Sequence, residues 1–355
     1  MIAPAWFWCL VTFVFGITIG SFLNVVIWRL PQGISVNDPA WSFCPNCKRR
    51  LTAIDLVPLF SFLILGQRCR SCKQPISWRY FAIELLTGLL FVALYLRYPQ
   101  DAANCVALLL FTAVLIPVFF IDLATFHIPD SLNLLAFGVA VGRDVWGIAQ
   151  HEPGHELVWG WLPRSILGAV VGVLIFGVVR ILGWLWKRVE AMGLGDVLLA
   201  RAMGAMLISV TPAAFHPLRL FPIWVLLACF SGVIVGPALI LIRRAQAAKL
   251  QAVPEPVLDR EDEPEEEENS SLTWEVLAVG YCLVLGDLVD YVRDLLRGRR
   301  GQAPEPQEDN WQPAPTAIPF GPFMVIGFLA TVFIGEPLTA WYLAYALPRP
   351  QPLEG

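Results

Sequence analysis

Two aspartates are the residues of this sequence best suited to acid–base chemistry. Asp122 follows a charge-free run at 103–121, and Asp196 follows the tripeptide Gly-Leu-Gly at 193–195. Two carboxyl groups that share one proton can act as base and acid on one water molecule, because like charges about 3 Å apart cannot both ionise. The glycines would let another stretch of backbone approach closely. Taken singly, either aspartate is better explained as a helix cap at a membrane interface, so the prediction rests on the pair.

Four cysteines form the strongest local motif. They occur as Cys44-Pro-Asn-Cys47 and, after 21 intervening residues, as Cys69-Arg-Ser-Cys72. Zn(II) takes four thiolates in a tetrahedron, and each CxxC turn supplies two of them. Two disulfides or idle thiols are the alternative, which a cytoplasmic loop disfavours. We expect a closed, structural zinc site that folds a loop of about 50 residues with little core of its own.

A third motif matches a zinc-peptidase signature in its letters alone. Residues 151–155 read His-Glu-Pro-Gly-His, which fits HExxH. That chemistry needs both histidines on one helical face, and Pro followed by Gly disfavours a helix. We interpret the match, with His151 and His155, as chance. His127 lies close enough in sequence to tune Asp122, although a lone histidine in a loop is more often solvated.

The composition shows which elements must position these groups. Of the 355 residues, 57% are hydrophobic and only 15% are charged, whereas ordinary soluble domains have about a quarter charged residues. A spanning helix takes about 20 mainly apolar residues. The sequence therefore predicts an all-α polytopic membrane protein of about eight transmembrane helices with a small cytoplasmic zinc-knuckle loop domain. The expected spans are 5–28, 80–97, 103–121, 131–148, 165–186, 194–211, 220–242 and 317–335.

The orientation follows from the basic residues, since short cytoplasmic loops are rich in Lys and Arg. Residues 29–79 carry eight Lys and Arg against two Asp, a net charge of +6. We expect this loop inside the cell and the N-terminus outside. Residues 1–28 have neither a basic start nor a cleavage site, so we expect a retained helix instead of a signal peptide. Alternating spans then bring Asp122 and Asp196 to the same, cytoplasmic face.

The region after residue 242 has a different composition. Residues 255–268 include nine Asp and Glu, as in a solvated tether. Residues 272–292 are apolar but contain Asp287 and Asp290, so we expect an interfacial or folded-back helix instead of a ninth span. A Pro-rich linker follows at 303–319. The expected domains are a first transmembrane helix (1–28), the zinc-binding loop (29–79), a membrane core (80–242), an acidic, Pro-rich insert with one apolar helix (243–316) and a last transmembrane helix (317–345).

With these motifs in place, the sequence resembles the type IV prepilin leader peptidases. These are bifunctional peptidases and N-methyltransferases of type IV pili and type II secretion, and they belong to the GxGD aspartyl proteases. The resemblance covers about residues 1–242 and 316–340. It is carried by the two CxxC pairs and by residues 20–31, 75–88, 122–130, 193–196 and 319–323, in the family's order.

The resemblance implies that Asp122 and Asp196 are the catalytic residues. It implies cleavage of a short basic leader from prepilins or pseudopilins at the cytoplasmic face of a bacterial inner membrane. The expected partners are therefore these substrates and the lipid bilayer. No nucleic acid is expected as a partner. The zinc-binding N-terminal region is associated with methylation of the new N-terminus by S-adenosylmethionine. No glycine-rich nucleotide loop is visible for that cofactor.

The sequence departs from the family pattern at two places. Leu198 stands where members usually have a Lys two residues after the second aspartate, and we hypothesise that Arg201 partly replaces it. The insert at 243–316 is the second departure. Two alternatives therefore stay open: a proton-coupled transporter that uses the aspartates as relay groups, and an inactive relative kept as a pilus assembly scaffold.

Overall fold

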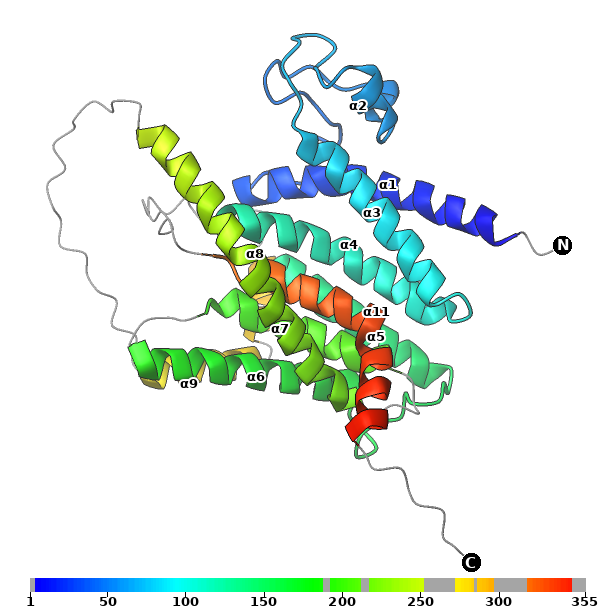
Figure 1. Cartoon of the computed structure of the whole chain (residues 1–355), viewed down its shortest axis with the longest axis vertical. Coiled ribbons are helices and arrows are strands. Elements are labelled where there is room, and N and C mark those ends of the chain that lie inside the picture. Colours follow the sequence, from blue (N-terminus) through cyan, green and yellow to red (C-terminus); the bar gives the residue numbers. More distant parts are fainter. Residues whose placement is uncertain are drawn as a thin grey trace, which may run out of the picture. The chain divides into compact units, whose positions relative to one another are not determined.

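The computed structural model of the chain describes residues 4–187, 192–211, 217–251, 272–283, 286–296 and 318–346. Across these ranges the regular structure is helical apart from isolated bridges (Figure 1), which confirms the all-α prediction. The helices are α1 (Ala5–Arg29), η1 (Leu30–Gln32), η2 (Ala53–Leu56), α2 (Phe60–Ile64), α3 (Trp78–Arg97), α4 (Ala102–Thr125), α5 (Asp130–Ala149), α6 (Arg164–Lys187), α7 (Leu194–Ser209), η3 (Pro217–Arg219), α8 (Leu220–Gln251), α9 (Leu272–Leu283), α10 (Gly286–Leu296) and α11 (Gly321–Ala346).

Among the described residues, seven helices are long and apolar enough to cross a membrane: α1, α3, α4, α5, α6, α8 and α11. They correspond to seven of the eight predicted spans. The eighth, predicted at 194–211, forms α7, which has 16 residues. Its length of about 24 Å is less than the ~30 Å of a bilayer's hydrocarbon core. Because every side chain from Val197 to Ser209 is buried, α7 is an internal helix surrounded by protein.

The chain divides into two compact units, residues 1–143 with 288–309 and residues 144–287 with 310–355. In the first unit, α1 lies against α3, and α4 contacts both (Figure 1). The approach is close, because a Cβ atom on Gly20 of α1 would lie 2.8 Å from the Cα atom of Glu84. Lipid provides no hydrophobic force between helices, so such small residues let backbones pack instead.

In the second unit, α6 and α7 also pack backbone against backbone. A Cβ atom on Gly172 of α6 would lie 2.3 Å from the carbonyl oxygen of Ala200 in α7. A Cβ atom on Gly204 would lie 2.3 Å from the carbonyl oxygen of Gly168. Each helix therefore presents small residues four positions apart, a common contact pattern between membrane helices. This contact holds α7 beside α6 along most of its length.

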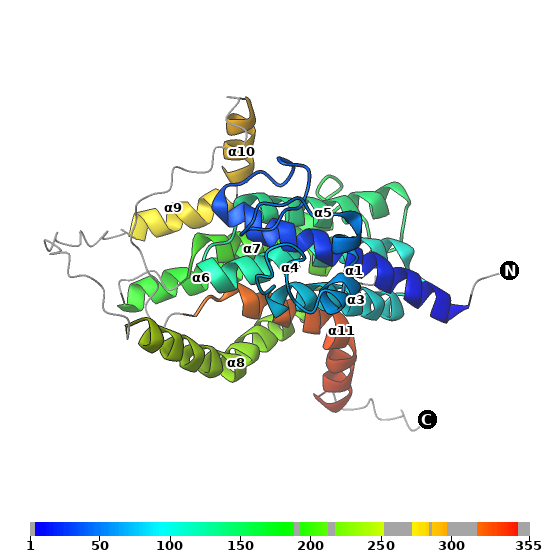
Figure 2. The same ribbon diagram turned by 90° about the horizontal axis from the view of Figure 1, so that it is seen from above.

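The other closely packed pair of the second unit is α8 with α11. The indole N–H of Trp224 donates to the carbonyl oxygen of Met324 at 3.2 Å. Both helices bend, α11 in Figure 1 and α8 in Figure 2. Each contains an interior proline, Pro237 in α8 and Pro337 in α11. Proline removes one backbone hydrogen bond and crowds the preceding turn, which accounts for a bend.

The predicted insert contributes two described helices, α9 and α10, where one apolar helix was expected. α9 has 12 residues and α10 has 11, each fewer than the about 20 that a spanning helix takes. α9 contacts α6 and α7 within the second unit. Asp287, in the first turn of α10, has a carboxylate that pairs with Arg201 of α7. The acidic tether predicted at 255–268, and the Pro-rich linker up to residue 317, lie outside the described residues.

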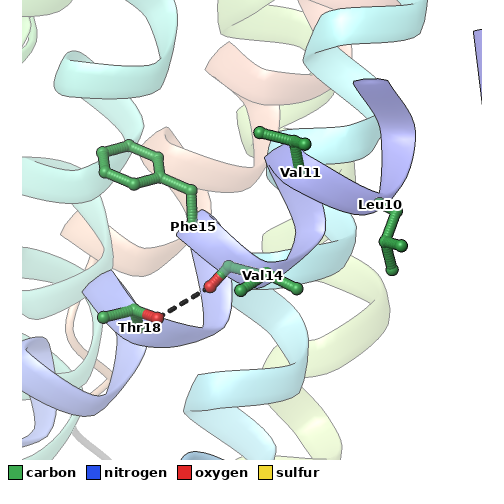
Figure 3. Close-up of a pocket in the computed structure, with 5 residues that line it drawn as sticks. All are labelled: Leu10, Val11, Val14, Phe15 and Thr18. Atoms are coloured by element: carbon green, nitrogen blue, oxygen red, sulfur yellow. Dashed lines mark hydrogen bonds between the residues drawn. The ribbon is translucent and has the colours of Figure 1, made fainter. Parts of the chain in front are cut away.

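The outer surface of α1 has a shallow apolar hollow (Figure 3), lined by Leu10, Val11, Val14, Phe15 and Thr18. The Thr18 hydroxyl donates within the helix to the carbonyl oxygen of Val14 at 2.8 Å. The hollow therefore offers no acid, base or metal ligand to a bound molecule. Its exposed apolar side chains suit contact with lipid.

Candidate functional site

The four cysteines predicted to bind a metal come together in the loop between α1 and α3. Their Sγ atoms all lie within 4.8 Å of one another. The separations are 3.9 Å between Cys44 and Cys72 and 4.0 Å between Cys47 and Cys69. Four sulfurs bonded to a central Zn(II) at ~2.3 Å would be about 3.8 Å apart in a tetrahedron. The donor set and its spacing therefore fit four-coordinate zinc.

Each CxxC segment is held by the same tight turn. The backbone N–H of Lys48 donates to the carbonyl of Cys44 at 2.9 Å, and that of Lys73 donates to the carbonyl of Cys69 at 3.0 Å. Both lysines have positive φ angles, 55° and 57°. Isolated bridges between Phe43 and Arg50 and between Arg68 and Pro75 close the two turns.

The thiols of this cluster differ in acidity because their surroundings differ. The backbone N–H of Gln74 holds the pKa of Cys72 at about 6, and backbone N–H groups of Cys72 and Ser71 lower the pKa of Cys69. At Cys47 the Arg49 backbone N–H lowers the pKa, but burial and the neighbouring sulfurs outweigh it and raise it to about 11. A divalent cation would relieve the crowding of negative sulfurs, since thiolates are the form that binds metal.

Arg29, at the end of α1, organises the start of the loop that carries the four cysteines. Its buried guanidinium donates to the carbonyl oxygens of four residues at 2.8–3.1 Å: Ser35, Val36, Pro39 and Trp41. A fork of five donors suits arginine to this task. In the sequence, Arg29 stands out as one charge of the +6 loop and as part of the stretch 20–31. The need of neighbouring carbonyls for a donor is visible only in three dimensions.

Glu84 fastens the same loop to α3. Its Oε2 atom accepts from the backbone N–H of Leu59 at 2.8 Å. Nearby, the ring of Phe62 packs on Trp78 and Phe81, with centroids 5.1 and 5.4 Å apart. The sequence contained a signal for this contact, because Glu84 is a single acidic residue in an otherwise apolar window and such residues usually have a partner.

Asp122 lies in the last turn of α4 and its side chain is buried, with 4% of the residue exposed. The backbone N–H of Phe126 donates to the Asp122 carbonyl at 2.9 Å. Phe126 has a positive φ of 57°, which ends the helix. His127 follows as an exposed residue.

Asp196 lies in the first turn of α7 and is half-buried. Gly193 precedes the helix in an extended conformation, with φ −65° and ψ 151°. A Cβ atom there would lie 3.8 Å from Oδ2 of Asp196. The carboxylate therefore turns back towards the start of the helix, where the positive end of the helix dipole favours an anion. Asp122 belongs to the first unit and Asp196 to the second, and each is placed within its own unit.

The segment 151–155 does not form the helix that a zinc-peptidase site requires. It lies beyond the end of α5, and His151 has a positive φ of 53°. Nδ1 of His155 lies 2.8 Å from Oδ1 of Asp144, and Oδ2 of Asp144 accepts from the backbone N–H of Ser165 at 2.7 Å. This His–Asp pair ties the loop to the start of α6, and the geometry agrees with a chance match to HExxH.

Leu198 and Arg201, the positions of the first departure from the family pattern, are both buried in α7. The Arg201 guanidinium contacts Asp287 through two pairs of atoms at 2.7 and 2.5 Å. It also donates to the carbonyl oxygen of Cys282 at 3.3 Å. In the structure Arg201 therefore forms an ion pair with the insert. That it also partly replaces the missing lysine stays a hypothesis.

Comparison with known proteins places both sets of residues in family regions. Residues 14–98 match the Bacterial Peptidase A24 N-terminal domain, and residues 109–237 match the Type IV leader peptidase family. The first region contains the four cysteines and the second contains both aspartates. No solved structure matches the chain.

Three similar proteins are each named prepilin leader peptidase/N-methyltransferase. The protein of Myxococcus xanthus is 32% identical over 341 residues, covering 91% of this chain and 89% of its own. That of Aeromonas hydrophila is 34% identical over 69% of this chain and 85% of its own. That of Klebsiella pneumoniae is 37% identical over 56% of this chain and 85% of its own.

Fold and sites together define a class: an integral membrane protein of apolar helices with a four-cysteine loop able to bind a metal ion. The matches over most of the chain specify the class further. The chain belongs to the prepilin leader peptidase/N-methyltransferase family.

Proposed function

We propose that this protein is a membrane aspartyl endopeptidase that removes the leader peptide from prepilins or pseudopilins, with Asp122 and Asp196 as its catalytic residues. The observation that carries the proposal is the match of residues 109–237 to the Type IV leader peptidase family. That region includes the end of α4 with Asp122 and the start of α7 with Asp196. Helix ends present these carboxyl groups on backbone that is fixed by tight packing.

The chemistry needs no covalent intermediate. One carboxylate takes a proton from a water molecule as the water attacks the scissile carbonyl carbon, and the other carboxyl group donates a proton to the amide nitrogen as it leaves. The carbon–nitrogen bond breaks, and each aspartate ends with the charge that the other began with. Two acids that share one proton are suited to this exchange.

The second activity that we propose is methylation of the new N-terminus, since the similar proteins carry N-methyltransferase in their names. S-adenosylmethionine would supply the methyl group. Cys44, Cys47, Cys69 and Cys72 would hold a structural Zn(II), which closes the loop at 29–79 and takes no part in proton transfer. The domain boundaries predicted from the sequence are part of this proposal, with a peptidase core at 80–242.

The proposed location is the inner membrane of a bacterial cell. The +6 charge of residues 29–79 supports a cytoplasmic zinc loop, and with it an N-terminus outside. Leader cleavage then takes place at the cytoplasmic face. Cysteine accessibility on intact cells tests this orientation, since a cysteine added to the loop at 29–79 should stay unlabelled by a membrane-impermeant maleimide.

Co-expression with a prepilin tests the aspartyl mechanism. Wild type, Asp122→Asn and Asp196→Asn are compared through the mass of the pilin N-terminus, with Glu156→Gln as a control for loss of one exposed acid. We expect the leader to be removed by wild type and by the control, and retained with either aspartate variant. An added mass of about 14 units would report one methyl group.

The alternatives predict other results. A transporter would lose ion or solute flux in the aspartate variants and would cleave no prepilin in any form. An inactive scaffold would leave the leader uncut in wild type while pilus assembly still depended on the protein. Equal cleavage by all four proteins would contradict the aspartyl mechanism.

A further inference from the structure

A buried ion pair links the insert to the segment Gly193-Leu194-Gly195-Asp196, which carries the second aspartate. Arg180 of α6 contacts Glu275 of α9, with 2.6 Å from Nε to Oε2 and 3.3 Å from Nη2 to Oε1. The side chains are 3% and 0% exposed. The guanidinium and the carboxylate thus form a bidentate pair. Two parallel hydrogen bonds join the opposite charges and also fix the relative orientation of the two groups.

The same guanidinium continues to the backbone beside Asp196. Nη1 of Arg180 donates to the carbonyl oxygen of Met192. Met192 directly precedes Gly193-Leu194-Gly195-Asp196. Glu275 orients Arg180, and Arg180 holds the residue at which the chain enters the motif. Glycines do little to restrict their own backbone, so the conformation of this entry depends on contacts from outside it.

A second ion pair secures the helix that follows. Arg201, five residues after Asp196, contacts Asp287 of α10 at 2.7 and 2.5 Å, and both side chains are buried. It also donates to the carbonyl oxygen of Cys282 at the end of α9. The insert therefore meets α7 on both sides of the α9–α10 junction.

Close packing supports the two ion pairs. A Cβ atom on Gly177 of α6 would lie 2.8 Å from a methyl carbon of Val279 in α9. Val279 is buried, while Val276 and Leu277 of the same helix are exposed. α9 thus has one face fixed against α6. The Myxococcus xanthus relative matches 91% of this chain, more than the chain without its insert could supply.

We infer that the insert is a working part of the peptidase, and that Glu275, acting through Arg180, is a positioning residue for the loop that carries Asp196. The inference rests on the proposed function for its effect on cleavage, but the contact itself does not. Removal of the Glu275 charge leaves the buried guanidinium of Arg180 without the carboxylate that orients it. The Met192 carbonyl and the entry to α7 then lose the contact that holds them.

The test uses the full chain, purified in detergent, with Glu275→Gln as the variant. Val276→Ala, an exposed neighbour, is the control. We expect kcat for prepilin cleavage to fall about tenfold or more, as for loss of a charge-assisted hydrogen bond, with little change in KM. Glu275→Asp should restore part of the rate. Arg180→Lys should behave like Glu275→Gln, because one ammonium cannot serve both partners in this geometry.

Hydrogen exchange separates positioning from the proposed function. In Glu275→Gln the amides of residues 193–196 should exchange about tenfold faster or more, whereas Val276→Ala leaves them unchanged. If wild type cleaves no prepilin, the proposed function fails and exchange still decides the inference. Unchanged exchange at these amides would overturn it. So would a variant that accumulates poorly yet cleaves at the normal rate per folded molecule, because its role is then purely structural.

Discussion

The Sγ atoms of Cys44 and Cys72 lie 3.9 Å apart although 28 positions separate the two residues in the chain. The contact joins the first CxxC turn to the second, and Cys47 with Cys69 makes the equivalent contact at 4.0 Å. Each turn therefore meets the other through both of its sulfurs. The two turns form one site, so a metal ion bound by four sulfurs would need both turns.

We expect the purified protein to contain about one zinc ion per chain, as a closed four-thiolate site does. Cys72→Ser should lose this metal, because a tetrahedral site that lacks one thiolate binds zinc much more weakly. Metal analysis by mass spectrometry checks the content. Cys229→Ser is the matched control, since Cys229 is an exposed thiol of α8, and a loss of zinc there would contradict the assignment.

The reactivity of the thiols should follow their different acidity in protein stripped of metal. The pKa of Cys72 is held at about 6 by the Gln74 backbone N–H, and that of Cys47 is raised to about 11. At pH 7 Cys72 is therefore mostly thiolate and Cys47 is a neutral thiol, and the thiolate is the form that reacts. Iodoacetamide should modify Cys72 first, with a rate that falls as the pH drops through about 6. Equal rates for both would contradict this prediction.

Arg29→Lys should loosen the start of the zinc loop. A lysine ammonium has three donors and no fork, so part of the set of carbonyls at 35–41 loses its partner, at a cost of about 0.5–1.5 kcal/mol for each hydrogen bond lost. Limited proteolysis should then cut near Trp41 sooner than in wild type. Arg79→Lys, the same change at an exposed position, should leave the pattern unchanged.

Gly204→Ala should destabilise the second unit. The added Cβ would lie 2.3 Å from the carbonyl oxygen of Gly168, so α6 and α7 must separate, at a cost of about 1–3 kcal/mol. Thermal unfolding in detergent measures the effect. Gly142→Ala in α5 meets no atom within 4 Å and should be neutral or slightly stabilising. Equal stability of the two variants would count against the close α6–α7 contact.

Much of the fold could be predicted because the signals are local. A run such as 103–121 has no charge, and a chain in a bilayer must satisfy its backbone hydrogen bonds within such a segment. The spacing of the CxxC pairs was enough to predict a four-thiolate site for a metal ion. The prediction at 194–211 was less accurate, because hydropathy does not distinguish a helix that faces lipid from one enclosed by protein, and α7 proved short and buried. In the part of the insert that the structure describes, two helices occur, α9 and α10.

The residues that hold the sites were harder to find. Glu84, Glu275 and Arg180 are each a single charge in an apolar segment. The contact of Glu84 with Leu59 spans 25 positions, and that of Arg180 with Glu275 spans 95. Nothing in the spacing of Arg180 and Glu275 indicates that they meet. The small residues at 168 and 172, four apart, were an available signal for a helix contact, but their partners at 200 and 204 could not be chosen without the packing.

The sequence by itself determined the membrane-spanning class, the four cysteines able to bind a metal ion and the identity of the candidate aspartates, because these depend on residue type and on short spacing. Only the tertiary structure decided that α7 is enclosed, that Arg29 and Glu84 secure the four-cysteine loop, and that the insert is anchored by Glu275 and Asp287. These relationships join residues far apart in the chain. The geometry of the whole fold decides which buried charges pair and which backbone segments pack closely together.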